Sequence, residues 1–357
     1  MTPDEWVHTS AAQQIRFWAG AAADVGRVVR DLGGRRILLI TTSGRLDSAD
    51  GRGLVQALGS ALVSTYSGAR AHVPTSAVEA ALRQSRRDGV DTVVSFGGGS
   101  CADLGKAVCY FTEQEQGTPG SSHLDRPALP HVSVPTTYSG AELTSFFGMT
   151  DERTGRKAGA GGPTVAPVSA IYDPRLTLST PARVSAETGM NALAHCIECA
   201  YSPHRTPEAE AIALAGVGRI VEELPVVVER PTDIEPRTRM LAGAVLGGRC
   251  LQNASMGVHH ALAQLLGGRT GMPHGLANAV LLPHALRFNR QAAPQEIEQI
   301  ARALGGASDA AGAVDALLLR LGLPVRLSDC GVDDEDLEVV ARLAESPDAR
   351  AILEAAF

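Results

Sequence analysis

The sequence lacks the features that mark membrane, secreted and nucleic-acid-binding proteins. No apolar run approaches the ~20 residues that a transmembrane helix needs. The acidic start, Met1–Trp6, has no apolar segment of the kind found in secretory signals. The net charge of −7 leaves no basic excess that would suit nucleic acid or an anionic membrane surface. We therefore expect a cytoplasmic protein whose partner is a small molecule.

Cysteines are few and scattered. Six in 357 residues, far apart in the chain, do not form a disulfide framework. Cys196 and Cys199 make a CxxC pair, but no second pair completes a four-thiolate zinc site, and the pair lies inside a helical pattern. We interpret them as two thiols that pack within a helix, which argues against redox or zinc chemistry there.

The composition is that of a globular chain with two domains. Hydrophobic residues make up 44% and charged residues 20% of the chain, enough apolar material for two cores. Short buried strands are predicted in the first half, with helix-like spacing at 51–64 and 76–88. The predicted strands cover 36–41, 91–96, 131–135 and 167–172. Strands separated by helices indicate βαβ units and a mainly parallel sheet.

The strand signal stops after Asp173-Pro174, and helical spacing takes over. The predicted helices cover 183–202, 207–223, 236–267, 276–287, 294–304, 308–321, 333–344 and 347–356. We therefore expect an α/β domain at 1–178 and an all-helical domain at 179–357. The stretch 117–130, rich in glycine, serine and proline, is predicted to be a surface loop within the first domain.

A glycine-rich turn follows the second predicted strand. Gly97, Gly98, Gly99 and Ser100 precede a helix predicted from Ala102 to Tyr110. Glycines let a backbone approach a pyrophosphate closely, and a helix N-terminus offers unpaired N–H donors. The alternative is a strand-to-helix turn that needs glycine for its shape. No acidic residue ends the first strand, where Thr41, Thr42 and Ser43 stand instead.

Hydroxyl groups follow another predicted strand end. Thr136 and Thr137 come directly after Pro135, and Thr144 lies seven residues further on. Hydroxyls at the carboxyl ends of parallel strands suit hydrogen bonding to a cofactor, although a turn with a helix cap would place them there too. Lys157 could reach a ribose or phosphate, or be an ordinary surface lysine.

Three histidines stand out in the helical half. Asn191 and His195 are four residues apart and so share one helix face, while His260 and His274 lie on two further elements. With Asp at 191 the set would suit Fe²⁺ or Zn²⁺, but Asn supplies a neutral oxygen. Each histidine could instead be a satisfied core residue. Gln264, one turn after His260, is expected to face the same space, whereas His259 points away from His260 by about 100° and is expected either to support the site from behind or to belong to the packing.

Together these motifs resemble the group III, iron-containing alcohol dehydrogenases, over essentially the whole chain. The resemblance rests on Gly97–Ser100 with Asp103 and Lys106, Pro135–Thr137, Tyr172–Pro174, Gly189–Glu198, Gly257–His260 and Pro273–Ala279. It is strongest to the maleylacetate reductase branch, which reduces maleylacetate to 3-oxoadipate and is generally considered metal-independent. Gln264 departs from both branches, where a histidine is common.

The resemblance implies a Rossmann-like parallel-sheet domain followed by a helical one, as in dehydroquinate synthase-like proteins, with the active site in the cleft between them. NADH or NADPH would be bound by Gly97, Gly98, Gly99, Ser100, Asp103, Thr136, Thr137, Thr144 and Lys157, with Thr42 and Ser43 nearby. The catalytic candidates are His195, His260, His274, Asn191 and Gln264. We expect no metal; any metal present would be held by His195, His260 and His274.

These expectations describe a NAD(P)H-dependent reductase of an α,β-unsaturated oxo acid, with an oxo dicarboxylate as substrate and a homodimer as the assembly. One alternative is an alcohol dehydrogenase or reductase of the same family that acts on another carbonyl compound, in a biosynthetic pathway for example. Another is a member of the superfamily that binds a nucleotide without redox chemistry. The altered residue at 191 and Gln264 keep both alternatives open.

Overall fold

The computed structural model describes residues 12–116, 129–154, 156–344 and 346–357. Most of the predicted loop at 117–130 lies outside the described residues. The described chain packs into two compact units: an α/β unit, which contains the residues up to Thr137 and Ala141–Thr180, and a helical unit, which contains Tyr138–Gly140 and Pro181–Phe357. No helix in the described ranges has both the length and the apolar character needed to cross a bilayer.

The α/β unit is built on a six-stranded, fully parallel sheet with strand order β1-β8-β5-β4-β2-β3. Its strands are β1 (Gln14–Phe17), β2 (Ile37–Ile40), β3 (Leu62–Tyr66), β4 (Thr92–Gly97), β5 (His131–Pro135) and β8 (Ser169–Tyr172). A separate antiparallel hairpin consists of β6 (Phe146–Asp151) and β7 (Arg156–Gly161). The predicted α/β fold with a parallel sheet is confirmed.

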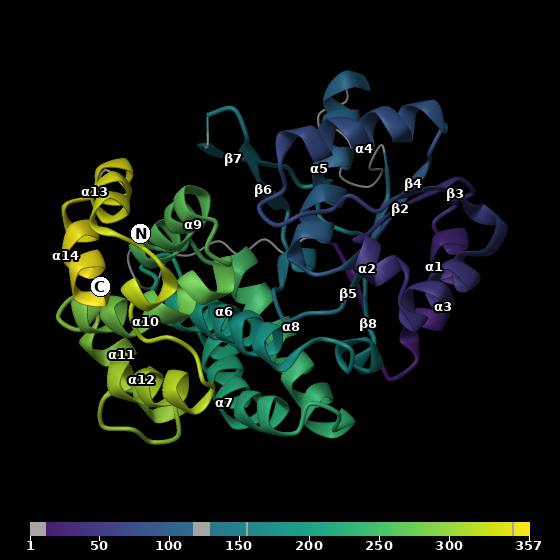
Figure 1. Cartoon of the computed structure of the whole chain (residues 1–357). Helices are drawn as coiled ribbons and strands as arrows, with labels where there is room; N and C mark the ends of the chain where they lie inside the picture. Colours follow the sequence, from purple (N-terminus) through teal and green to yellow (C-terminus); the bar gives the residue numbers. More distant parts are fainter. Residues whose placement is uncertain (1–11, 117–128, 155, 345) are drawn as a thin grey trace. The chain divides into compact units, whose positions relative to one another are not determined.

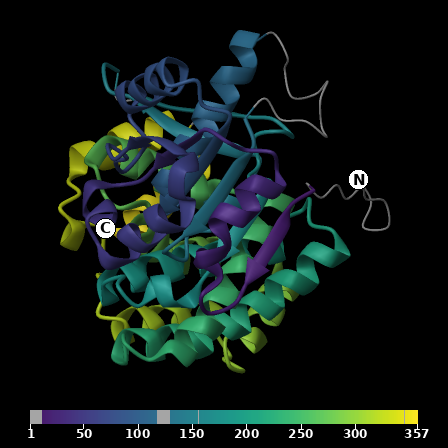
Figure 2. The same cartoon turned by 90° about the vertical axis from the view of Figure 1, so that its right-hand side faces the viewer.

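Helices cover both faces of the sheet, because its central strands are apolar on both sides. In β2, Leu38 and Ile40 pack on one face and Ile37 and Leu39 on the other, and all four are fully buried. The helices of this unit are α1 (Val25–Asp31), α2 (Ser43–Leu46), α3 (Ala49–Leu58), α4 (Thr75–Arg87) and α5 (Gly99–Gln116). Helices α4 and α5 cover one face, and α1 and α3 cover the other (Figures 1 and 2).

The helical unit follows the predicted pattern closely. It consists of α6 (Ala182–Tyr201), α7 (Pro207–Glu229), α8 (Ile234–Asn253), α9 (Val258–Thr270), α10 (His274–Asn289), α11 (Pro294–Ala303), α12 (Ala310–Arg320), α13 (Asp334–Leu343) and α14 (Pro347–Ala356). Helix α6 packs against α7, α8 and α10, and every residue from Gly189 to Ala200 is buried. A helix buried on all sides cannot show a clear amphipathic pattern.

Several predicted boundaries are wrong. The helix predicted at 51–64 ends at Leu58, because Gly59 has φ 60°, and the chain continues into β3. The helix predicted at 236–267 is two helices, α8 and α9, separated where Ala254 and Gly257 adopt extended backbone angles. The helix predicted at 207–223 runs on through Pro225 to Glu229, because packing within the unit outweighs the local preference of proline. The helix predicted from Ala102 begins at Gly99.

We expect the contact between α6 and α8 to be intolerant of added volume. A Cβ at Gly247 would lie 2.8 Å from the carbonyl oxygen of Ala192, so Gly247→Ala should lower the free energy of unfolding by about 1–3 kcal/mol through overpacking. Gly218→Ala, in α7, is the matched control, because the nearest atom to its Cβ is 3.7 Å away. It should leave stability unchanged or raise it by up to about 1 kcal/mol. Urea unfolding of both variants measures the difference, and equal effects would contradict this packing.

Candidate active site

The glycine-rich turn joins β4 to α5 and leaves no room for side chains. Gly97 has φ 147°, and a Cβ there would lie 2.6 Å from Cys101 Sγ. A Cβ at Gly98 would lie 3.2 Å from the side chain of Thr137. Helix α5 starts at Gly99, and the N–H groups of Cys101 and Ala102 donate to the Gly98 carbonyl, so the N–H groups that come before them, at the very start of the helix, are the ones left to a ligand. The turn therefore suits a phosphate group at a helix N-terminus.

Two threonine hydroxyls lie beside this turn. Thr136 follows β5, and its backbone N–H donates to the Gly97 carbonyl at 2.9 Å. The side-chain oxygens of Thr136 and Thr137 are buried and have no hydrogen-bond partner within the described part of the chain. Buried hydroxyls without partners are costly unless a ligand or water completes them. These residues fit the sugar–phosphate portion of a dinucleotide.

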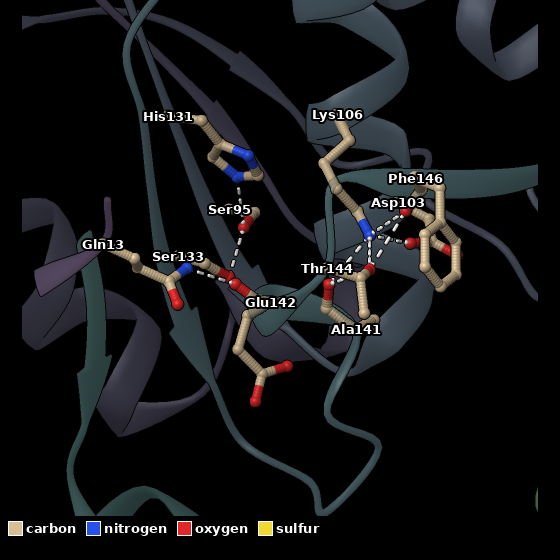
Figure 3. Close-up of polar contacts among 10 residues, drawn as sticks. All are labelled: Gln13, Ser95, Asp103, Lys106, His131, Ser133, Ala141, Glu142, Thr144 and Phe146. Carbon is tan, nitrogen blue, oxygen red and sulfur yellow. Dashed lines mark hydrogen bonds and ion pairs between the residues drawn. The ribbon is translucent and has the colours of Figure 1, made fainter. Parts of the chain in front are cut away.

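Lys106 on α5 makes hydrogen bonds to the segment that joins β5 to β6 (Figure 3). Its ammonium group is fully buried and lies 2.8 Å from Asp103 Oδ1, and it donates to Thr144 Oγ1 and to the Ala141 carbonyl, each at 2.8 Å. It also donates to the Phe146 carbonyl. Asp103 and Thr144, both predicted to contact cofactor, are therefore held in place by Lys106.

Figure 3 also shows polar side chains that come from strands β4 and β5. His131 Nε2 lies 2.8 Å from Ser95 Oγ, which donates to Ser133 Oγ at 2.9 Å. Burial and the charge of Lys106 lower the pKa of His131 to about 3, so it is neutral at pH 7. We assign these groups to the packing of the sheet rather than to a reaction.

The remaining cofactor candidates lie in the same unit. Thr42 caps α2 by accepting a hydrogen bond from the Arg45 N–H, and Ser43 is the first residue of that helix. Lys157 is half-buried on β7, opposite Thr150. Burial lowers the pKa of Lys157 to about 8, and the Asp103 carboxylate partly offsets this effect.

The three predicted histidines come together in the helical unit. His195 on α6 and His260 on α9 have ring centroids 5.4 Å apart, and those of His260 and His274 on α10 are 4.9 Å apart. His195 and His260 are buried, with 1% and 8% exposure, while His274 is half-buried. Burial, with a contribution from the neighbouring histidines, holds the pKa of His195 well below its usual range. His195 and His274 are 79 positions apart in the sequence, and the fold brings them and His260 into one cluster of imidazoles.

Two asparagines lie beside His274 at the edge of this cluster. Asn278 Nδ2 donates to Asn191 Oδ1 at 2.7 Å and lies 3.1 Å from His274 Nε2. Asn191 Nδ2 in turn donates to the Ser139 carbonyl at 3.2 Å. Asn278 was not among the predicted site residues. Its signal was its position four residues after His274, on the same helix face.

These contacts do not fit a four-ligand metal site. Asn191 and His274 both direct their acceptor atoms at the Asn278 amide, and no carboxylate stands among the four candidate positions. Within the described ranges, no three His, Cys, Asp or Glu side chains are grouped so as to hold a metal ion. The site is better described as three imidazoles in ring contact, one of which lies beside a pair of hydrogen-bonded amides.

His259 belongs to the packing, as predicted. Its Nδ1 lies 2.9 Å from Glu198 Oε2 and its Nε2 lies 2.9 Å from the Asn278 carbonyl. Glu198 also accepts from the Gly257 N–H at 2.9 Å. Although burial opposes charge on both groups, their mutual attraction raises the pKa of His259 and lowers that of Glu198.

Three further polar residues of the helical unit differ from these histidines in exposure or in partners. Gln264, one turn after His260, is exposed to solvent, unlike the histidines it was expected to join. Arg269 lies 2.7 Å from Asp336 and 3.2 Å from Glu335 at the surface, so its charge is already paired. Arg249 is half-buried on α8.

Known proteins resemble this chain along its whole length. The family model for iron-containing alcohol dehydrogenase matches residues 12–174, and that for the C-terminal part of the Fe-containing alcohol dehydrogenase family matches 185–353. Maleylacetate reductase of Rhizobium sp. (strain MTP-10005) is 35% identical, over 99% of this chain and 97% of its own.

Solved structures of proteins from this family resemble the chain over nearly its whole length. Maleylacetate reductase from Agrobacterium tumefaciens has a TM-score of 0.87 and 35% identity, covering 99% of this chain and 98% of that one. Sulfoacetaldehyde reductase from Bifidobacterium kashiwanohense, in complex with NAD⁺, also has a TM-score of 0.87, at 25% identity, with the same coverage of both chains.

The lowered pKa of Lys157 predicts a pH dependence of dinucleotide binding. Lys157 carries its charge below about pH 8 and loses it above, so a dinucleotide phosphate should bind roughly tenfold more weakly at pH 9 than at pH 7. Titration calorimetry with NADH across this range measures the change. Lys157→Met should bind weakly at pH 7 with a flat profile, and Lys157→Arg should bind tightly across the range. If the affinity of Lys157→Met for NADH still falls between pH 7 and pH 9, another titrating group is responsible for the pH dependence.

Proposed function

Because the chain belongs to the iron-containing alcohol dehydrogenase family, we propose that it is a NAD(P)H-dependent reductase of an α,β-unsaturated oxo acid, with maleylacetate as the substrate. The family predicted from the motifs, and its proximity to the maleylacetate reductase branch, are confirmed by the matches. The chain is therefore an oxidoreductase, and the proposal concerns its substrate, cofactor and metal requirement.

The cofactor proposal rests on the α/β unit. The turn at Gly97–Ser100 and the buried hydroxyls of Thr136 and Thr137 supply amide donors and hydroxyls for a dinucleotide. One relative by structure is described in complex with NAD⁺. Thr42 and Ser43 carry no charge that would repel a 2′-phosphate, so we propose that both NADH and NADPH are accepted.

The substrate proposal rests on one observation: three histidines gather at a site where the acidic position is Asn191. Without a metal to polarise a carbonyl, the imidazoles must stabilise the negative charge that develops on an enolate oxygen. A bound dihydronicotinamide would supply a hydride to the electron-poor carbon. His260 and His274 orient the oxo acid and return a proton, while His195, kept neutral by burial, packs against the ring of His260 and supports it.

The assembly is also a proposal. A homodimer is implied by the family resemblance, and light scattering of the purified protein measures its mass directly.

Reduction of maleylacetate is the direct test. Following the loss of NADH or NADPH absorbance with maleylacetate should show turnover, with the two cofactors differing in kcat/KM by less than ~100-fold, about 2.7 kcal/mol. A panel of simple aldehydes, ketones and saturated oxo acids provides the comparison. Turnover of an aldehyde but not of maleylacetate would favour the alternative of another carbonyl substrate. No redox turnover with any acceptor would favour a nucleotide-binding role.

Removal of the histidines should impair the reaction but not cofactor binding. His260→Ala and His274→Ala should each lower kcat/KM for maleylacetate by roughly 10²–10⁴, the range for an acid–base group. The Kd for NADH should stay within about twofold, because the glycine-rich turn lies in the α/β unit. Gln264→Ala is the matched control on the same helix, and its solvent exposure predicts a much smaller effect. Unchanged kinetics in both histidine variants would place the reaction elsewhere.

Activity should not depend on a metal. Turnover after exhaustive chelation should equal that of the untreated enzyme, and elemental analysis should find no stoichiometric metal. Asn191→Asp restores a carboxylate and should bind Zn²⁺ more tightly, but its turnover should fall, because a carboxylate oxygen would then face the Ser139 carbonyl. Activity lost on chelation and regained with Fe²⁺ or Zn²⁺ would refute the proposal.

A further inference from the structure

The orientation of every amide around His274 follows from one backbone carbonyl. The Ser139 carbonyl can only accept, so the side chain of Asn191 must present its Nδ2 to it. Asn191 then presents Oδ1 on its other side, where Asn278 lies at 2.7 Å. Because Oδ1 accepts, Asn278 must present Nδ2, and the same nitrogen lies 3.1 Å from His274 Nε2. An amide nitrogen has no acceptor capacity, so His274 Nε2 is the acceptor.

A second set of contacts holds the backbone of Asn278. Its carbonyl lies 2.9 Å from His259 Nε2, and the other nitrogen of His259 lies 2.9 Å from a carboxylate oxygen of Glu198. Both partners of His259 accept, so both of its ring nitrogens donate and the ring is an imidazolium paired with Glu198. Glu198 and His259 are fully buried, and such a pair is rigid because neither partner can be solvated if the other moves away.

We propose that Asn278 is a positioning residue that fixes His274 as the tautomer with the proton on Nδ1 and the lone pair on Nε2. The proposal rests on the proposed function only for the role of His274 as a donor to the oxo acid. In neutral histidine one ring nitrogen donates and the other accepts, so fixing Nε2 as the acceptor makes Nδ1 the donor. Asn191 contributes both bonds of this arrangement, because its Nδ2 donates to the Ser139 carbonyl while its Oδ1 accepts from Asn278. An aspartate at this position could still accept from Asn278, but it would have no donor for the Ser139 carbonyl.

The tautomer can be observed directly. In protein labelled with ¹⁵N-histidine, long-range ¹H–¹⁵N spectra distinguish a protonated from an unprotonated ring nitrogen, and a His274→Gln variant identifies the signals of His274 among the ten histidines. The parent protein should show His274 protonated at Nδ1 and unprotonated at Nε2. A proton on Nε2, or on both nitrogens at neutral pH, would overturn the proposal. The measurement needs neither substrate nor a further variant.

Asn278→Asp replaces the donor opposite His274 Nε2 by an acceptor with almost no change in shape, and it also removes the donor to Asn191 Oδ1. A carboxylate oxygen opposite His274 Nε2 should move the proton to that nitrogen, and kcat for maleylacetate should fall roughly 10- to 100-fold while the KM for NADH stays constant. Asn289→Asp, three turns along the same helix, is the matched control and should leave both the spectrum and kcat unchanged. A purely structural Asn278 would lower the Tm of the variant without moving the proton, which would also overturn the proposal.

The two proposals fail separately. If the parent enzyme shows the expected tautomer but does not reduce maleylacetate, the proposed role of Asn278 stands and the proposed substrate is wrong. If the parent enzyme reduces maleylacetate but His274 is protonated on Nε2, the proposed substrate stands and the proposed role of Asn278 is wrong.

Discussion

The helical unit depends on one constraint: α6 is buried on all sides and still carries Asn191, His195 and Glu198. Burying a polar or charged group without a partner costs several kcal/mol, so neighbouring helices must supply partners. Helix α9 supplies His259 to Glu198, and α10 supplies Asn278 to Asn191. The orientation of the three helices is therefore fixed by hydrogen bonds with direction, and not only by apolar packing. Of the three side chains, His195 has no hydrogen-bond partner among the described residues.

In the α/β unit, too, a buried polar side chain takes its partners from neighbouring elements, and here that side chain is Lys106. Lys106 is a buried cation that is satisfied by one carboxylate, one hydroxyl and two carbonyl groups. Removing a partner from a buried charge typically costs 3–5 kcal/mol, so these groups are fixed with respect to α5. In both units, residues with polar side chains do not simply line a site. They determine where the neighbouring backbone lies.

The sequence was informative where the signal is local and less so where it depends on distant contacts. Strand β2 is a continuous apolar run and β4 is mostly apolar, and both were predicted. The strand β3 was missed because helical spacing continues past Gly59, and the β6–β7 hairpin was missed because its glycines give little alternation. His195, His260 and His274 were identified as a set from their motifs. The bond between Asn191 and Asn278 joins residues 87 positions apart, and no local pattern predicts such a pair.

The short segment Tyr138–Gly140 has a consequence for how this chain can be divided. It lies within the part of the sequence that builds the α/β unit, yet it packs with the helical unit. Tyr138 is fully buried, and Arg237, also fully buried, donates to its hydroxyl at 3.3 Å, while Gly140 approaches Gly248 so closely that a Cβ would lie 2.7 Å from it. A fragment that starts at Pro181 would contain every helix of the unit but not the tyrosine that fills its core, nor the carbonyl on which Asn191 depends. The helical half is therefore not a module that gene fusion or exchange could transfer intact as one continuous stretch of chain.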